Sequence, residues 1–227
     1  MRQDVAEPHA PAPSWPNETA RILYVPRLGL APVDPEVASQ VKAFARRLSS
    51  MGHDVREGEV FFDLEIATGV WHVVSRADVA RVMAEKSADE KLAGVSARAI
   101  PEDRRRVSGA DYLGAMESVF AIRRLVAELF EGAELVLTPR APAPPWPAET
   151  PYLDRIDGEP AGPRDHAIFT GWVNVVGVPA INLPIGVSRS RLPIGAHVGA
   201  DDRLLAFARD VSGAIPPLAF PQFEAAP

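Results

Sequence analysis

Residues 21–60 read RILYVPRLGLAPVDPEVASQVKAFARRLSSMGHDVREGEV, and this stretch decides the fold class. It opens with Arg21–Pro26, a short apolar run that is typical of a β-strand, and it closes with His53–Val60, which predicts a second, weaker strand. The residues between the two strands have the pattern of a helix. A strand, a helix and a second strand in this order indicate a parallel crossover, and therefore an α/β sheet.

The helix of this crossover has a well-marked start and end. Asp34 can cap its N-terminus, Pro35 suits the first helical position, and Gly52 is a favoured residue just after a helix. Between them, apolar side chains recur at intervals of three and four, as on the buried face of a helix. This face is predicted to consist of Val37, Val41, Phe44, Leu48 and Met51.

Two longer helices are predicted in the middle of the chain. Phe62–Glu90 is largely helical in composition, and a capping box that starts at Ser75 predicts that the helix restarts there. A second capping box, starting at Ser108, precedes the helix predicted over Gly109–Glu131. The apolar face of this second helix is predicted to be Tyr112, Ala115, Met116, Val119, Ile122, Val126 and Leu129.

Three further strands and one helix are predicted in the last hundred residues. The strands are Glu134–Thr138, Ala180–Ile185 and Leu192–Val198, and the helix is Asp201–Val211. The proline-rich stretch 139–163 is predicted to be a long loop, and loops of that length in compact domains are usually functional.

The 23 residues from His166 to Ser188 contain no Asp, Glu, Lys or Arg, a length that would suit a membrane span. Two asparagines, two prolines and three glycines within it argue against a span, so we predict a buried turn and strand and expect no membrane association. Asn174, Gly177 and Pro179 are predicted to fix the turn.

Composition excludes several classes of protein. The 227 residues carry a net charge of −6, which argues against a nucleic-acid-binding scaffold. The chain has no cysteine, which excludes disulfides, thiolate nucleophiles and cysteine-ligated metals. Its opening residues lack an apolar signal-peptide core, so we expect a cytoplasmic protein. We expect a loose segment over 1–20, one α/β domain over 21–213 and a loose tail over 214–227.

The residues alone assemble no catalytic constellation. Gly186-Val187-Ser188 approaches a hydrolase nucleophile elbow but lacks the second glycine. The five histidines are scattered, and His72 with nearby acidic residues is better interpreted as a polar helix face than as a metal site. Walker and GxGxxG loops are absent from the sequence as well, so we expect no metal and no cofactor.

Several segments, taken in order, resemble the C-terminal portion of the amidase signature family. They cover roughly residues 21–213, and the resemblance implies an α/β fold in which helices flank a mixed sheet. The segments are RILYVP (21–26), APVDPEV (31–37), GHDV (52–55), ADYL (110–113), LVLTP (135–139), IDG (156–158), FT (169–170), NVVGVPA (174–180), PIG (184–186), LPIG (192–195) and DRLL (202–205).

The resemblance implies hydrolysis or transfer of amide groups by a Ser–cisSer–Lys triad whose nucleophile lies in a Gly/Ser-rich segment. In the family this segment precedes the strand seen here at Arg21, and the sequence has no counterpart of it. Ser49-Ser50 is the only serine pair, and it falls inside a predicted helix. The three lysines, at positions 42, 86 and 91, match no family position. We therefore predict no catalytic residue in this chain.

The resemblance further implies that this portion completes the sheet and shapes the acyl-side pocket. The candidate substrate-binding residues are Thr138, Trp146, Phe169 and Asn174. Plain structural interpretations stay open beside these roles: Thr138 ends a strand, Trp146 covers the core, and Asn174 belongs to the buried turn.

Two residues depart from the family pattern. Arg140 stands where the family usually has a small or hydroxyl residue, and His197 stands where glutamine is common. These departures leave the substrate preference open.

Three hypotheses follow. The first is an amidase-family segment, either truncated or one half of a split enzyme, that associates with a separate chain carrying the catalytic half or with itself. The second is a non-catalytic module that binds a small amide or carboxylate on the same scaffold. The third is an unrelated hydrolase whose site includes Ser188 and His197.

Overall fold

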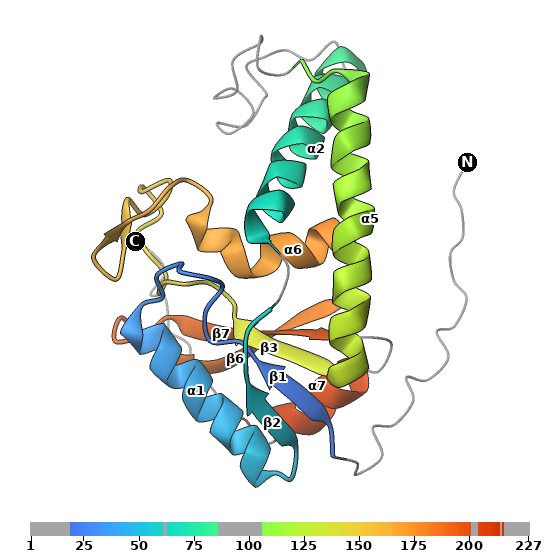
Figure 1. Cartoon of the computed structure of the whole chain (residues 1–227). Coiled ribbons are helices and arrows are strands. Elements are labelled where there is room, and N and C mark those ends of the chain that lie inside the picture. Colours follow the sequence, from blue (N-terminus) through green and yellow to red (C-terminus); the bar gives the residue numbers. More distant parts are fainter. Residues whose placement is uncertain (1–18, 61–62, 86–105, 201–203, 214, 216–227) are drawn as a thin grey trace, which may run out of the picture. The chain divides into compact units, whose positions relative to one another are not determined.

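The computed structural model describes residues 19–60, 63–85, 106–213 without 201–203, and 215. It forms two compact units (Figure 1). The first unit comprises residues 1–59, 132–169 and 178–227, and the second comprises residues 60–131 and 170–177. Most of the segments that we predicted to be loose, 1–20 and 214–227, lie outside the described residues.

The first unit is built on a five-stranded mixed sheet, as predicted. Its order is β2-β1-β3-β7-β6. β1 runs parallel to β2 and β3, whereas β7 runs antiparallel to β3 and β6. The parallel crossover predicted from residues 21–60 is thereby confirmed. The strands are β1 (Arg21–Tyr24), β2 (Asp54–Glu57), β3 (Leu135–Pro139), β6 (Ala180–Val187) and β7 (Pro193–Ala200).

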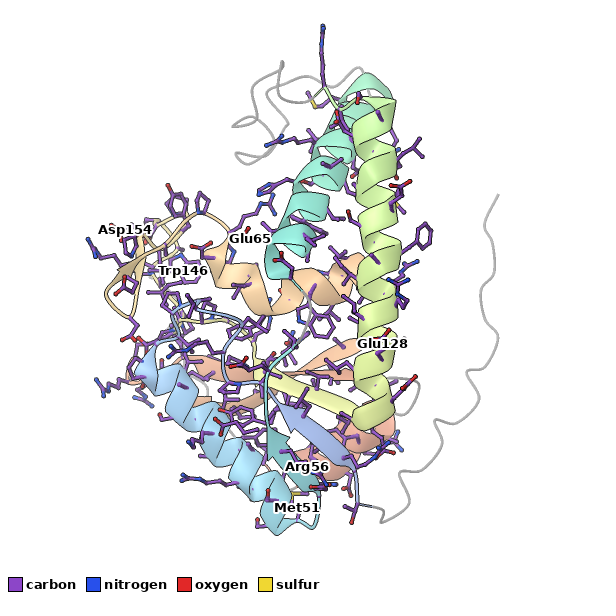
Figure 2. All side chains as sticks on the ribbon, in the orientation of Figure 1. Met51, Arg56, Glu65, Glu128, Trp146 and Asp154 are labelled. Atoms are coloured by element: carbon purple, nitrogen blue, oxygen red, sulfur yellow. The ribbon has the colours of Figure 1, made fainter. Side chains whose placement is uncertain are left out.

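Helix α1 (Pro35–Ser50) lies along the sheet and contacts β2, β3, β6 and β7 (Figure 1). The Asp34 carboxylate accepts a hydrogen bond from the Glu36 amide at 2.8 Å, which is the predicted cap. Gly52 has φ +100°, the left-handed conformation that favours glycine after a helix. Four of the five predicted face residues are buried. The fifth, Met51, is 37% exposed because it already lies beyond the last helical turn (Figure 2).

The last helix of the first unit is α7 (Leu204–Ser212), which contacts β6 and β7. The first residues of the predicted helix, 201–203, lie outside the described residues. Within the predicted loop 139–163, the chain forms a small hairpin of β4 (Arg155–Ile156) and β5 (Glu159–Pro160), followed by the short helix η2 (Asp165–Ala167). The hairpin turns at Asp157 and Gly158, both with positive φ, which is the Asp-Gly signature of a tight turn.

The second unit consists of three helices: α2 (Leu64–Glu85), α5 (Gly109–Gly132) and α6 (Ile168–Val176). The last residue of α5 and the first two residues of α6 belong to the first unit. The predicted restart of α2 at Ser75 is wrong: the helix is continuous, and Asp78 pairs with Arg81 at 2.7 Å instead of serving a cap. The predicted capping box before α5 is confirmed, since the Ser108 Oγ accepts from the Asp111 amide at 3.0 Å and the Asp111 carboxylate accepts from the Ser108 amide at 3.2 Å.

The core-facing side of α5 consists of residues that the sequence predicted, namely Ala115, Val119, Ile122, Val126 and Leu129. Tyr112 and Met116, also predicted on this face, are not fully buried: Tyr112 is 42% exposed because it lies in the first turn, and Met116 is half-buried. No helix in the described part of the chain is both long and apolar enough to cross a membrane.

Helix α6 replaces the first part of the buried turn that was predicted over residues 166–188. Its valines favour strands by propensity, but tertiary packing overrides that weak preference: Trp172, Val173 and Val176 are buried. Asn174 is exposed on this helix, and the actual turn follows it at Gly177, with φ +76°. The Arg123 guanidinium of α5 donates to the Val176 carbonyl at 2.9 Å and satisfies the end of α6.

We expect Asp34→Ala to destabilise the protein by about 1 kcal/mol, because the Glu36 amide at the start of α1 loses its acceptor. Urea unfolding followed by circular dichroism measures this as a lower midpoint. Lys42→Ala, an exposed change on the same helix, is the control and leaves the midpoint unchanged. Equal midpoints for the Asp34 variant and the unaltered protein would contradict the capping role.

Candidate functional site

A cavity of about 310 Å³ opens in the first unit where β3 ends. Four parts of the chain meet there: the first turn of α1, the segment after β3, the short helix η2 and the start of β7. The residues that line it include Val37, Arg140, Trp146, His166, Ile194 and Gly195. Its volume lies at the small end of the range for ligand sites in proteins.

Arg140 supplies the charge of this cavity. Its amide donates to the Gly195 carbonyl at 3.0 Å, which continues the β3–β7 pairing by one residue. A Cβ atom at position 195 would come within 3.2 Å of the Arg140 Cβ, so glycine lets the arginine side chain lie closely over β7. In the part of the chain that the structure describes, no carboxylate pairs with the Arg140 guanidinium.

Trp146 and His166 form an aromatic wall of the cavity. The Trp146 indole N–H donates to the Thr150 carbonyl at 2.8 Å, which fixes the ring on the segment after β3 (Figure 2). The two rings meet edge to face, with centroids 5.4 Å apart and planes at 66°. The Nδ1 atom of His166 is buried and has no hydrogen-bond partner among the described residues. Within this part of the chain, the wall therefore holds one polar atom that makes no hydrogen bond.

A row of polar residues crosses three strands of the sheet beside this cavity. Thr138 on β3 is opposite His197 on β7, and His197 is opposite Asn182 on β6. Directly opposed residues of antiparallel strands project from the same face, so the three side chains are neighbours. Thr138 is fully buried and its hydroxyl donates to the Pro139 carbonyl at 2.9 Å, whereas Asn182 is exposed.

His197 is the perturbed titratable group of this row. It is 4% exposed, and its Nδ1 has no hydrogen-bond partner in the described part of the chain. Burial lowers the pKa of His197 to about 4, and the positive charge of Arg140 acts on this pKa in the same direction. The imidazole is therefore neutral at pH 7, and the field of the Arg140 charge reaches it.

The structure brings one of the four candidate site residues into the cavity. That residue is Trp146. Thr138 lies in the sheet next to the cavity rather than in its lining, and Phe169 is fully buried at the start of α6. Asn174 belongs to the second unit and is exposed.

Sequence reasoning missed His166 and regarded Arg140 only as a departure from the family pattern. A signal for Arg140 was present, because it directly follows a strand, and the chain just beyond the end of a strand is a common place for ligand groups. The pairing that sets Arg140 against Gly195 depends on the β3–β7 register, and that register was not predicted from the sequence.

The hypothesis of a hydrolytic site that includes Ser188 and His197 is contradicted by the register of the sheet. Ser188 lies in the turn between β6 and β7, where its amide donates to the Leu192 carbonyl at 2.7 Å. Five residues of chain separate Leu192 from His197, which at about 3.3 Å per residue is roughly 16 Å. The Ser188 hydroxyl instead bonds to the Ser190 hydroxyl at 2.7 Å, as in a structural turn.

The only serine pair in the sequence lies on α1, as predicted. Both of its residues are exposed, and the Ser50 hydroxyl donates to the Arg47 carbonyl one turn earlier at 2.7 Å. Lys42 is exposed on the same helix, while Lys86 and Lys91 lie outside the described residues. Among the described residues, no group of three His, Asp or Glu side chains is placed to hold a metal ion.

We expect folding stability to depend on His197 below pH 6.5. A folded-state pKa below the unfolded value means that stability is fully present above pH 6.5 and is lost as the pH falls towards about 4. His197→Gln removes this loss, so between pH 7 and pH 4.5 the unaltered protein should lose about 2–3 kcal/mol more unfolding free energy than the variant.

Denaturant unfolding of both proteins at the two pH values measures this difference. Burial also lowers the pKa of His53, but His53 is present in both proteins, so its contribution to the pH dependence cancels when the two are compared. His72→Gln, a change at an exposed histidine, is the control and behaves as the unaltered protein. Parallel pH dependence of the His197 variant and the unaltered protein would contradict a buried neutral imidazole.

Known proteins resemble this chain over shares of its length that range from 40% to 97%. An amidase of Pseudomonas putida is 29% identical over 170 residues, which are 74% of this chain and 36% of that protein. One subunit of the glutamyl-tRNA(Gln) amidotransferase of Alkaliphilus metalliredigens is 34% identical over 92 residues, which are 40% of this chain and 18% of that protein.

Among solved structures, substrate-bound 6-aminohexanoate cyclic dimer hydrolase has a TM-score of 0.77 at 22% identity, covering 97% of this chain and 50% of that one. The chain thus spans half or less of the length of these relatives. The structural likeness shows the fold alone, which is the α/β fold with a mixed sheet that the sequence predicted. A model of the amidase family matches residues 3–203, and the chain therefore belongs to the amidase family.

Proposed function

We propose that this chain forms the ligand-binding, non-nucleophilic portion of an amidase-family α/β domain, whose reaction is the hydrolysis of a carbon–nitrogen amide bond. The observation that carries the proposal is the position of Ser49-Ser50 on α1, where both residues are exposed and Ser50 bonds to its own helix. The nucleophile and its base then come from residues other than these 227.

The chemistry explains why this portion is inert alone. A serine attacks an amide only when a neighbouring base takes its proton and preorganised N–H groups hold the oxyanion. Ser50 donates to a backbone carbonyl, which is no base, and Ser188 donates to or accepts from a second hydroxyl. What this portion contributes is the cavity after β3, which takes a small amide or carboxylate.

The outer edge of β6 supports association with a separate chain that carries the catalytic half. β6 has eight residues, and none of them is charged. Natural edge strands are usually protected by charges or covered, since their free N–H and C=O groups pair readily with another strand. No strand among the described residues pairs with this edge, and Asn182 of β6 is exposed, although the Val187 carbonyl at the end of β6 accepts from the Gln40 side chain at 2.8 Å. The catalytic half, or a second copy in its absence, would extend the sheet here.

A non-catalytic binding module is the second candidate function. One observation favours it: the cavity is lined entirely by residues of the first unit, so that no partner is needed to form it. This module would bind a small amide or carboxylate without turnover and would remain a monomer. A cytoplasmic location without nucleic-acid binding is part of both proposals.

We expect the purified chain to show no hydrolysis of short-chain acyl nitroanilides above the rate of a heat-treated sample. We also expect no covalent labelling by a fluorophosphonate serine probe, detected by intact-protein mass spectrometry. The double variant Ser49→Ala, Ser50→Ala is the matched control for background. Hydrolysis that the probe abolishes would show that a nucleophile is present in this chain, and the proposal would fail.

We expect the unaltered chain to self-associate with rising concentration through the β6 edge. Asn182→Lys places a charge beside that edge and should shift the species towards monomer, as measured by sedimentation velocity. Ser39→Lys makes the same change in charge on an exposed position of α1 and leaves association unchanged. A monodisperse monomer for the unaltered chain at every concentration would contradict the partner surface and favour the binding module.

A further inference from the structure

The cavity after β3 combines one cation with apolar walls. Arg140 has no carboxylate partner among the described residues, and Val37, Trp146 and Ile194 supply apolar surface around the same space. We propose that this cavity binds a small carboxylate with a compact apolar group, with Arg140 pairing with the carboxylate and Trp146 packing against the apolar group. The proposal rests on the proposed function and deepens it by naming the class of ligand.

The acidic residues nearest to the cavity in the sequence are Asp34, Glu36 and Asp165, and each accepts a hydrogen bond from a backbone amide, Asp165 from that of Gly162 at 2.7 Å. The Asp34 carboxylate accepts from the Glu36 amide at 2.8 Å, and the Glu36 carboxylate accepts from the Arg189 amide at 2.7 Å. Both therefore have hydrogen-bond donors other than Arg140. A guanidinium offers a planar pair of donors that matches a carboxylate, and it cannot lose its proton. An anion from outside is the partner that suits it.

The position of Arg140 is fixed by the backbone rather than by other side chains. Its amide bonds to the Gly195 carbonyl, and its Cβ lies over Gly195, where any larger residue would push it away. The stem of the side chain thus starts from a rigid point on the sheet. Arg140 is exposed, so its guanidinium is accessible to an anion from solution.

His166 provides a second polar contact. Its Nδ1 is buried and has no partner among the described residues, although the residue lines the cavity. A buried polar atom without a hydrogen bond costs free energy, and in the tautomer that carries a proton on Nδ1 it is a donor. A carboxylate oxygen is an acceptor that would satisfy it once the ring turns this buried atom towards the cavity.

The size and walls of the cavity select among anions. A volume of about 310 Å³ suits a single ring or a short branched group. Inorganic phosphate would pair with the charge but would leave the apolar wall of Trp146 and Ile194 without a contact. A carboxylate attached to a ring would contact both the arginine and the apolar wall. Benzoate is such a molecule and is the probe that we choose.

Benzoate titrated into the full chain, followed by isothermal calorimetry, tests the proposal. We expect saturable binding at one site, with at least tenfold weaker binding by Arg140→Gln and by Trp146→Ala. Arg46→Gln removes the same charge from an exposed position of α1 outside the cavity and retains full affinity. Benzamide, which has nearly the same shape without the charge, and phosphate, which has charge without the ring, should each bind at least tenfold more weakly.

A site-specific signal comes from His197, whose pKa the charge of Arg140 lowers. Bound carboxylate offsets that charge, so the NMR signals of the His197 imidazole carbon-bound protons, recorded at pH 7 where benzoate is ionised, should shift with benzoate. In Arg140→Gln these signals should not respond to benzoate. The variant need only be folded for this measurement, which its amide spectrum shows.

The proposal is overturned if benzoate does not bind, if Arg140→Gln binds it as well as the unaltered protein does, or if benzamide or phosphate binds equally. Unchanged NMR signals of His197 on saturation at pH 7 would also overturn it, since the ligand would then be elsewhere. Binding is measured without turnover, so failure here leaves the expected absence of hydrolysis untouched. Conversely, hydrolysis in the nitroanilide assay would refute the proposed function and not the carboxylate site.

Discussion

The antiparallel register between β3 and β7 is the constraint on which the first unit depends. All five residues of β3 are buried, and each is paired with a residue of β7, from Leu135 with Ala200 to Pro139 with Ala196. A shift by one residue would move every β3 side chain to the opposite face of the sheet and disrupt the packing on both faces. The same register sets His197 opposite Thr138 and continues into the contact of Arg140 with Gly195, so the site and the core share one alignment.

The positive charge of Arg140 has an electrostatic effect on the neighbouring His197. Burial lowers the pKa of His197, and the positive charge of the Arg140 guanidinium lowers it further, so the imidazole of the polar row carries no charge at pH 7. One permanent cation next to one neutral imidazole keeps the region positive over the whole physiological pH range. Arg140 is exposed and a guanidinium does not lose its proton, so this charge is independent of pH.

The order of helices and strands could be predicted because the sequence marks it locally. Asp34 and Ser108 cap the helices that follow them, and Gly52 ends a helix with a positive φ. Helix α6 could not be predicted, because its valines favour strands and its stability comes from packing and from Arg123. Of the candidate site, Trp146 was predicted as lining. The neighbourhood of Arg140, His166 and Gly195 arises from three distant segments, and no local pattern encodes it.

The bond from Arg123 to the end of α6 bears on how the second unit assembles during folding. The two residues are 53 positions apart in the chain, and α6 has nine residues, which is below the length at which an isolated helix is stable in water. The helical form of α6 therefore depends on tertiary packing, to which the bond from Arg123 of α5 contributes. Because α5 precedes α6 in the chain, the residue that satisfies the end of α6 is synthesised before the segment that needs it.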